Sequence, residues 1–224
     1  MAPAHRFRRR ASALLALAAT AALAGCAKEE LQQVGDTFGQ RVERDNCPAF
    51  GVPAYTGDVT LFDPPTSREA RAIDVVATIT DVRGTCDKAS DPANLVASVS
   101  FQIQAVRRDA GPARDVTLPW FTTVMRGGTV VVSKQIGQAV VHFDAGQLRA
   151  QASYSTGARI ARSAAALPED VVAKVNRKRK ATDPDAAVDP MTDPTVKAAL
   201  SRASFEVLVG FQLTSEQLSY NATR

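Results

Sequence analysis

The chain has 224 residues, of which 45% are hydrophobic and 22% charged, an ordinary globular composition that excludes wholesale disorder and collagen-like repeats. Its formal net charge is +4, but four of its 27 basic residues are arginines within the first ten positions. The remaining 23 basic residues balance 23 acidic ones, so the rest of the chain lacks the net field that drives nucleic-acid association. We therefore expect no nucleic-acid partner.

The N-terminus has the features of an export signal. Its arginine-rich start is followed by an uncharged Ala/Leu run over 11–23, which is too short to span a bilayer of about 30 Å. The next residues, Leu23-Ala24-Gly25-Cys26, resemble the lipobox of bacterial lipoprotein signal peptides. In that family the signal is cut just before the Cys, whose thiol receives a diacylglycerol and whose new amino group is usually acylated.

That resemblance implies a signal peptide over 1–25 and a membrane anchor at Cys26. The alternative is a secretory signal with a chance Cys after its cleavage site. In Gram-negative lipoproteins of this kind, an Asp directly after the lipidated Cys is associated with inner-membrane retention. Here Ala27 and Lys28 follow, so we expect an exported protein on the periplasmic face of the outer membrane.

The two other cysteines predict one disulfide. Lipidation of Cys26 leaves Cys47 and Cys86 as an even pair in an oxidising compartment. Two free structural thiols are the alternative. A metal or redox role for these cysteines has less support than a disulfide, because there is no Cys-x-x-Cys spacing and no neighbouring His. We expect no metal site and no cofactor.

Residues 26–46 form a predicted lipidated tether, with a weak helical pattern interrupted by Gly35 and Gly39. From Cys47 onward the hydrophobic period becomes two, which indicates strands with one buried face. The clearest alternations run over 97–105 and 205–213. The other predicted strands are Asp58 to Phe62, Ile73 to Val82, Val116 to Met125, Thr129 to Lys134, Gln138 to Phe143 and Leu148 to Ser155.

Turn residues separate these strands: Asp63-Pro64-Pro65, Arg83-Gly84, Asp91-Pro92, Asp109 to Pro112, Arg126-Gly127-Gly128 and Asp144-Ala145-Gly146. About eight short strands separated by such turns predict a mainly antiparallel β-sandwich of the Ig-like or fibronectin-like kind over 47–224.

A helical insertion is predicted before the last strand, over about 168–202. Pro168 and the acids after it suit a helix start, and the cations at its far end suit the helix dipole. Three Asp-Pro pairs then exclude regular structure, and a second helical turn spans about 195–202.

Catalysis is not expected. After signal removal His142 is the sole imidazole, and no Gly-x-Ser-x-Gly or Ser-x-x-Lys pattern supplies a nucleophile. We expect a solvent-facing or core-rim histidine. Scattered carboxylates leave a small envelope hydrolase as an alternative. A calcium site in the Asp-Pro segment is a weak hypothesis, because its spacing lacks the EF-hand Gly and Glu.

The strongest local charge feature is the basic run, defined as Lys174, Arg177, Lys178, Arg179 and Lys180. One hypothesis is that it binds anionic lipid, lipopolysaccharide phosphates or an acidic partner. The other is that the basic run ends a helix and is neutralised by the acids of its own linker. Trp120, the single Trp, is expected in the core, with a binding anchor as the alternative. Asn221-Ala222-Thr223 matches the glycosylation tripeptide and carries almost no weight.

The mature chain also resembles, in outline, uncharacterised proteobacterial outer-membrane lipoproteins. The stretches that suggest this are 75–86, Gly111-Pro112-Ala113 and 207–221. The resemblance implies class and compartment without a chemistry. The sequence thus predicts a membrane-anchored, noncatalytic binding or scaffolding lipoprotein with an envelope protein partner. An accessory or chaperone lipoprotein that binds lipid or lipopolysaccharide through the basic run is the alternative.

Overall fold

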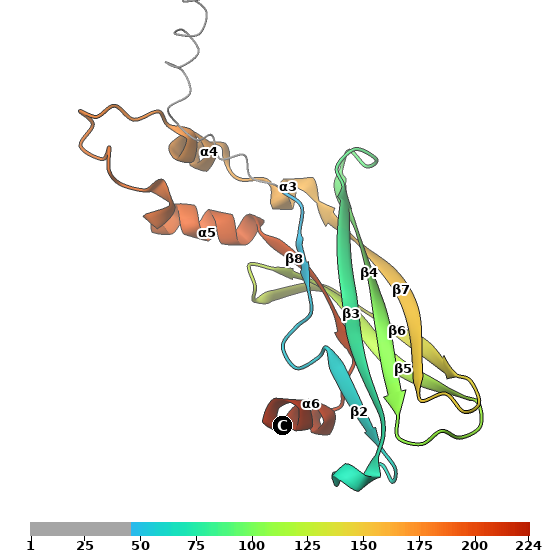
Figure 1. Cartoon of the computed structure of the whole chain (residues 1–224). Helices are drawn as coiled ribbons and strands as arrows, with labels where there is room; N and C mark the ends of the chain where they lie inside the picture. Colours follow the sequence, from blue (N-terminus) through green and yellow to red (C-terminus); the bar gives the residue numbers. More distant parts are fainter. Residues whose placement is uncertain (1–45) are drawn as a thin grey trace, which may run out of the picture. The chain divides into compact units, whose positions relative to one another are not determined.

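The computed structural model describes residues 46–224, so the predicted signal peptide, Cys26 and the tether up to residue 45 lie outside it. In the described part, eight strands form two four-stranded sheets that enclose one main hydrophobic core (Figure 1). The predicted fold class, a mainly antiparallel β-sandwich with a short helical insertion before its last strand, is confirmed.

The first sheet has the order β1-β8-β5-β6 and the second the order β2-β3-β4-β7. Only the β1–β8 pair is parallel among the strand pairs of the described residues. The first sheet consists of β1 (Ala49–Gly51), β8 (Phe205–Phe211), β5 (Arg114–Arg126) and β6 (Val130–Phe143). The second consists of β2 (Asp58–Phe62), β3 (Ile73–Asp87), β4 (Asn94–Arg107) and β7 (Arg149–Ala161).

The core is built by the inward positions of the alternating strands. In β4, alternate residues from Leu95 to Ala105 are buried, and in β8 the same holds for Phe205, Val207 and Val209. Trp120 on β5 packs edge to face against Phe101, with ring centroids 5.2 Å apart, so the prediction that it belongs to the core is confirmed.

Several predicted boundaries are wrong, and β7 extends to Ala161 rather than ending at Ser155. Residues 129–134 and 138–143 were expected as separate strands but belong to one continuous β6, because Gly137 stays extended opposite Trp120. The predicted turn at Arg83-Gly84 lies inside β3, where the register shifts by a bulge. Gly84 is needed for close approach: an added Cβ would meet the Phe50 ring at 2.0 Å. Five strands are also long rather than short, namely β3, β4, β5, β6 and β7.

The insertion between β7 and β8 contains α3 (Arg162–Ala165), α4 (Glu169–Asn176), η2 (Pro190–Thr192) and α5 (Pro194–Ala203). It has a small core of its own around Val171, Val196 and Ala199. Two further elements were not predicted, namely η1 (Ala70–Ala72) and the C-terminal α6 (Ser215–Thr223). Helix α6 begins with a capping box between Thr214 and Gln217.

The predicted disulfide between Cys47 and Cys86 is confirmed and joins the chain just before β1 to the end of β3. It therefore ties the two sheets together at one end of the sandwich. We call this the proximal end, where β8 also begins, because Ala49 lies opposite Glu206. The opposite, distal end holds the β4–β5 and β6–β7 connections, η1 and the start of α6, which lie in the lower part of Figure 1.

Candidate functional site

The basic run begins on α4 in the insertion and continues beyond the end of that helix. The Lys174 ammonium forms an ion pair with Asp193, and the Arg177 guanidinium forms one with Asp185. The hydrogen bond from Lys174 is the largest of the interactions that hold the pKa of the Asp193 carboxyl well below its ordinary value. Residues 178–180 follow without regular secondary structure. Lys174 and Arg177 of the basic run are thus paired with acids of the following linker.

The acids of the Asp-Pro segment also serve the backbone. Asp189 accepts the Met191 amide at the start of η2, and Asp193 accepts the Thr195 amide as the N-cap of α5. These bonds give Asp189 and Asp193 a structural role in the segment. Within residues 46–224, no cluster of three or more His, Cys, Asp or Glu side chains has an arrangement that would hold a metal ion.

His142 faces solvent on β6, as predicted, with buried neighbours on either side. Its Nδ1 lies 2.6 Å from Asp115 Oδ1 on the facing position of β5, and its Nε2 lies 3.4 Å from Asp144 Oδ1. The hydrogen bond to Asp115 raises the pKa of His142 above its ordinary value, and the charges of both carboxylates add to this. The arrangement stabilises an imidazolium on an open surface.

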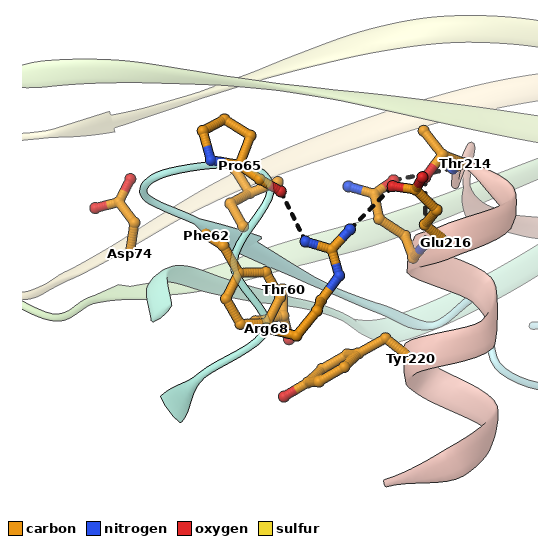
Figure 2. A pocket seen from close by; sticks show the side chains of 10 residues that line it. Thr60, Phe62, Pro65, Arg68, Asp74, Thr214, Glu216 and Tyr220 are labelled. Carbon is orange, nitrogen blue, oxygen red and sulfur yellow. Dashed lines mark hydrogen bonds and ion pairs between the residues drawn. The ribbon is translucent and has the colours of Figure 1, made fainter. Parts of the chain in front are cut away.

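A groove of about 380 Å³ lies at the distal end, between the end of β2, the 63–69 loop and α6 (Figure 2). Its apolar wall is formed by Phe62 and Tyr220, whose rings meet edge to face with centroids 5.2 Å apart. The remaining lining is mostly polar and includes Arg68, Asp74 and Glu216.

Arg68 bridges this groove. Its Nη2 lies 3.0 Å from a carboxylate oxygen of Glu216 on α6, and its guanidinium carbon lies 5.2 Å from the centre of the Phe62 ring. It also donates a hydrogen bond of 2.7 Å to the Pro65 carbonyl oxygen, and Figure 2 shows both contacts. Arg68 therefore ties the loop after β2 to α6.

A second hollow, of about 260 Å³, shares Asp74 with the groove. Three arginines line it, and two are paired with acids. Arg114 lies 2.7 Å from Asp74, and Arg108 lies 2.9 Å from Asp109. The distal end therefore carries two neighbouring hollows that combine paired charges with aromatic rings.

The third arginine, Arg107, is the last residue of β4, and its side chain is buried. Its guanidinium donates to four backbone carbonyl oxygens and stacks over the Phe143 ring at 5.3 Å. The acceptors are the carbonyl oxygens of Gln147 (2.6 Å), Pro112 (2.7 Å), Gly111 (2.9 Å) and Asp144 (3.1 Å). Arg107 thereby fastens the β4–β5 connection to the β6–β7 connection and gives the distal end a fixed shape.

Sequence reasoning missed these distal residues, although two signals were present. The alternation of β4 continues through Phe101, Ile103 and Ala105 to Arg107, which marks an arginine at an inward position. The Thr214-x-x-Gln217 spacing is a capping-box signature that predicts α6. The groove itself has no local signal, because its walls come from distant parts of the chain.

The side chain of Asn221 has a structural role. It is buried on α6, and its side-chain amide donates to the carbonyl oxygens of Tyr55 (2.9 Å) and Asp58 (2.8 Å). The tripeptide is therefore an anchor for α6 rather than an accessible glycosylation acceptor.

No helix in the described part of the chain combines the length and apolar character needed to cross a bilayer. Comparisons with models of known protein families, with curated proteins and with solved structures find no match to this chain.

Proposed function

We propose that this protein is a lipid-anchored, noncatalytic binding module on the periplasmic face of the bacterial outer membrane. The anchor would be Cys26, as the lipobox resemblance implies, and the partner would be a protein of the cell envelope. The sandwich would present its distal surface, which consists of the groove and the second hollow, to that partner.

One observation carries this proposal: the chain joins the sandwich at one end, while the sculpted surface lies at the other. Cys47 leads directly into β1 at the proximal end and is fixed there by its disulfide to Cys86. The groove and the second hollow open at the distal end. A tether that arrives at Cys47 would therefore leave the distal surface free of the membrane to which it leads.

The rigidity of the distal surface supports the same function. Arg107 holds two connections together, and Arg68 holds the loop after β2 against α6. A surface that is ordered before binding loses less conformational entropy when a partner docks. Binding through loops and ends positioned by a rigid scaffold is also the usual mode of sandwich domains.

The test is crosslinking in cells from the distal surface. A photoreactive amino acid replaces Thr66, an exposed residue on the loop that forms one wall of the groove, and the matched control replaces the exposed Val188 of the insertion. We expect one dominant envelope protein to be captured from position 66 and not from position 188. Mass spectrometry identifies the captured protein.

Anchoring is tested separately by fractionation. Full-length protein should sediment with the outer membrane, and Cys26→Ser should release it into the soluble fraction. Capture from position 66 should fall with that release. A wild-type protein that is soluble would contradict the anchor, and equal capture from both positions would contradict the distal surface.

A further inference from the structure

The outward face of the second sheet carries a group of uncharged polar side chains. Along β4 buried residues alternate with outward ones, and the strand register aligns the outward positions of β3, β4 and β7. Two adjacent rows of this face contain only hydroxyl and amide side chains. We call them the polar strip, which consists of Thr80, Gln102 and Ser153 in one row and Thr78, Gln104 and Gln151 in the next.

The polar strip is open to solvent. Four of its six residues are exposed, and Thr80 and Gln102 are half-buried. Figure 1 shows that the helices of the described residues lie beside β3, β4 and β7 rather than across them. Ser100 lies opposite Ser155 next to the strip and continues it with two more exposed hydroxyl groups. The rows together make an elongated polar surface.

The charged groups that border the polar strip are paired with one another. Arg83 lies beside the strip on β3, and its Nη2 is 2.8 Å from Asp81 Oδ1. On the other side Asp58 of β2 lies opposite Thr78, and its carboxylate forms an ion pair with Arg224. Charged residues make up about 25–35% of a typical soluble surface. Six neighbouring positions without a charge therefore set this face apart.

A hollow of about 500 Å³ lies on the same face and is lined by four residues of the polar strip. The next row adds Val76 opposite Val106, whose methyl groups also line the hollow. Arg149 is the one charged residue among those that line it. The hollow shares no lining residue with the groove or with the second hollow. It is therefore a separate place where a ligand can bind.

Two side-chain amides of the polar strip are already joined. Gln104 Nε2 donates a hydrogen bond of 2.9 Å to Gln102 Oε1. This bond uses neither the side-chain oxygen of Gln104 nor the side-chain nitrogen of Gln102. Gln151 lies opposite Gln104 on β7 and brings a third amide. Because an amide offers both donors and an acceptor, an amide of a ligand can extend this pair at either end.

The chemistry of this face argues against several ligand classes. The centres of protein interfaces are rich in aromatic residues, Met and Arg, and the polar strip contains none of these. Nucleic acids and anionic lipid surfaces require clustered cations, whereas the lining of the hollow includes Arg149 alone. Sugars carry many hydroxyl groups that each donate and accept hydrogen bonds, as Ser, Thr and Gln side chains do. A glycan is therefore the ligand class that matches.

We propose that the polar strip binds an uncharged glycan chain that carries acetamido groups. Its hydroxyl and amide side chains bond the sugar hydroxyls, and an acetamido group joins the pair of Gln102 and Gln104 as a further amide. The acetyl methyl group lies against Val76 and Val106 in the hollow. Each such bond replaces one to water and is weak, so affinity rises with the number of sugar units. This site goes beyond the proposed protein partner and does not depend on the lipid anchor.

Saturation-transfer NMR of the full-length protein, in micelles of a detergent without sugar groups, tests the proposal. Chitohexaose is the probe, and cellohexaose, which has the same linkage but no acetamido groups, is the matched comparison. We expect saturation of chitohexaose, strongest at its acetyl methyl protons because Val76 and Val106 line the hollow. Cellohexaose and the shorter chitobiose should both bind more weakly.

Variants place the binding on the polar strip. Gln104→Ala combined with Gln151→Ala removes two amides and should weaken chitohexaose binding by about tenfold. Gln138→Ala is the matched control, because Gln138 is an exposed glutamine on β6 of the other sheet. The control should bind chitohexaose like the wild type. The Trp120 fluorescence of every variant should match that of the wild type, which shows that the fold is kept.

Several results would overturn the proposal. These are absence of chitohexaose binding at millimolar concentration, equal binding of cellohexaose, and an equal loss of binding in Gln138→Ala. Stronger binding of polygalacturonate that disappears in Arg149→Gln would replace the uncharged glycan by an acidic one. Crosslinking from position 66 reports on the protein partner alone, so a failure there and a failure here are distinguishable.

Discussion

The guanidinium of Arg107 lies over the ring of Phe143, 5.3 Å from its centre, and joins two connections that are distant in the sequence. One of its bonds reaches the carbonyl oxygen of Gln147, 40 residues further along the chain. The distal end thus depends on a single buried cation whose hydrogen-bond partners are backbone carbonyl oxygens.

Replacing Arg107 by Met should destabilise the fold by about 3 kcal/mol, because four carbonyl oxygens lose a charged donor in a place with little access to water. Arg107→Lys should recover only part of this, since an ammonium lacks the planar fork that reaches several acceptors. Urea unfolding followed by Trp120 fluorescence measures both. Equal stability of the Met variant and the wild type would contradict the role assigned to Arg107.

Removing the disulfide with Cys47→Ala and Cys86→Ala should cost about 4 kcal/mol by the chain-entropy argument, given a sequence separation of 39. The two sheets would lose their covalent link at the proximal end. The measurement is the unfolding midpoint in urea, compared with Cys26→Ser, which leaves the bond in place. A midpoint equal to that of the control would show that the link adds no stability.

Gly84→Ala should destabilise the sandwich by about 1–3 kcal/mol, because the added methyl group overlaps the Phe50 ring. Gly111→Ala is the control, since nothing lies within 4 Å of its added Cβ, and it should leave stability nearly unchanged. Thermal unfolding of the two variants tests this. A similar loss in both would mean that glycine flexibility, rather than the Phe50 contact, matters at position 84.

His142 should titrate above its ordinary pKa of about 6.5 because Asp115 accepts a hydrogen bond from its ring. The raised pKa means that this contact stabilises the fold fully below about pH 6.5, and that the benefit is lost as pH rises through the folded-state pKa. Asp115→Asn should lower the pKa, and Asp144→Asn should lower it less because its contact is longer. An NMR titration of the ring proton measures all three proteins, and an unchanged pKa in Asp115→Asn would refute the assignment.

Several features could be predicted from the sequence because their signals are local. Period-two alternation over 97–105 and 205–213 predicted β4 and β8, since one face of each strand is buried. Pro168 with the acids after it predicted α4, and cysteine parity in an oxidising compartment predicted the Cys47–Cys86 bond. Each depends on neighbouring residues or on counting, so the fold class and the crosslink required no knowledge of the final packing.

The rest was decided by tertiary structure. Gly84 is a residue type typical of turns, but it lies within a strand. Its missing side chain leaves room for the ring of Phe50 from another strand. The groove forms where Arg68 meets Glu216, which is 148 residues away, and the Tyr154 hydroxyl of β7 bonds the Val140 backbone of the other sheet. Sequence alone predicted the fold class, most of the strands and the cysteine pair. Only the packing of distant segments determined the distal surface, because that surface consists of contacts that no local pattern encodes.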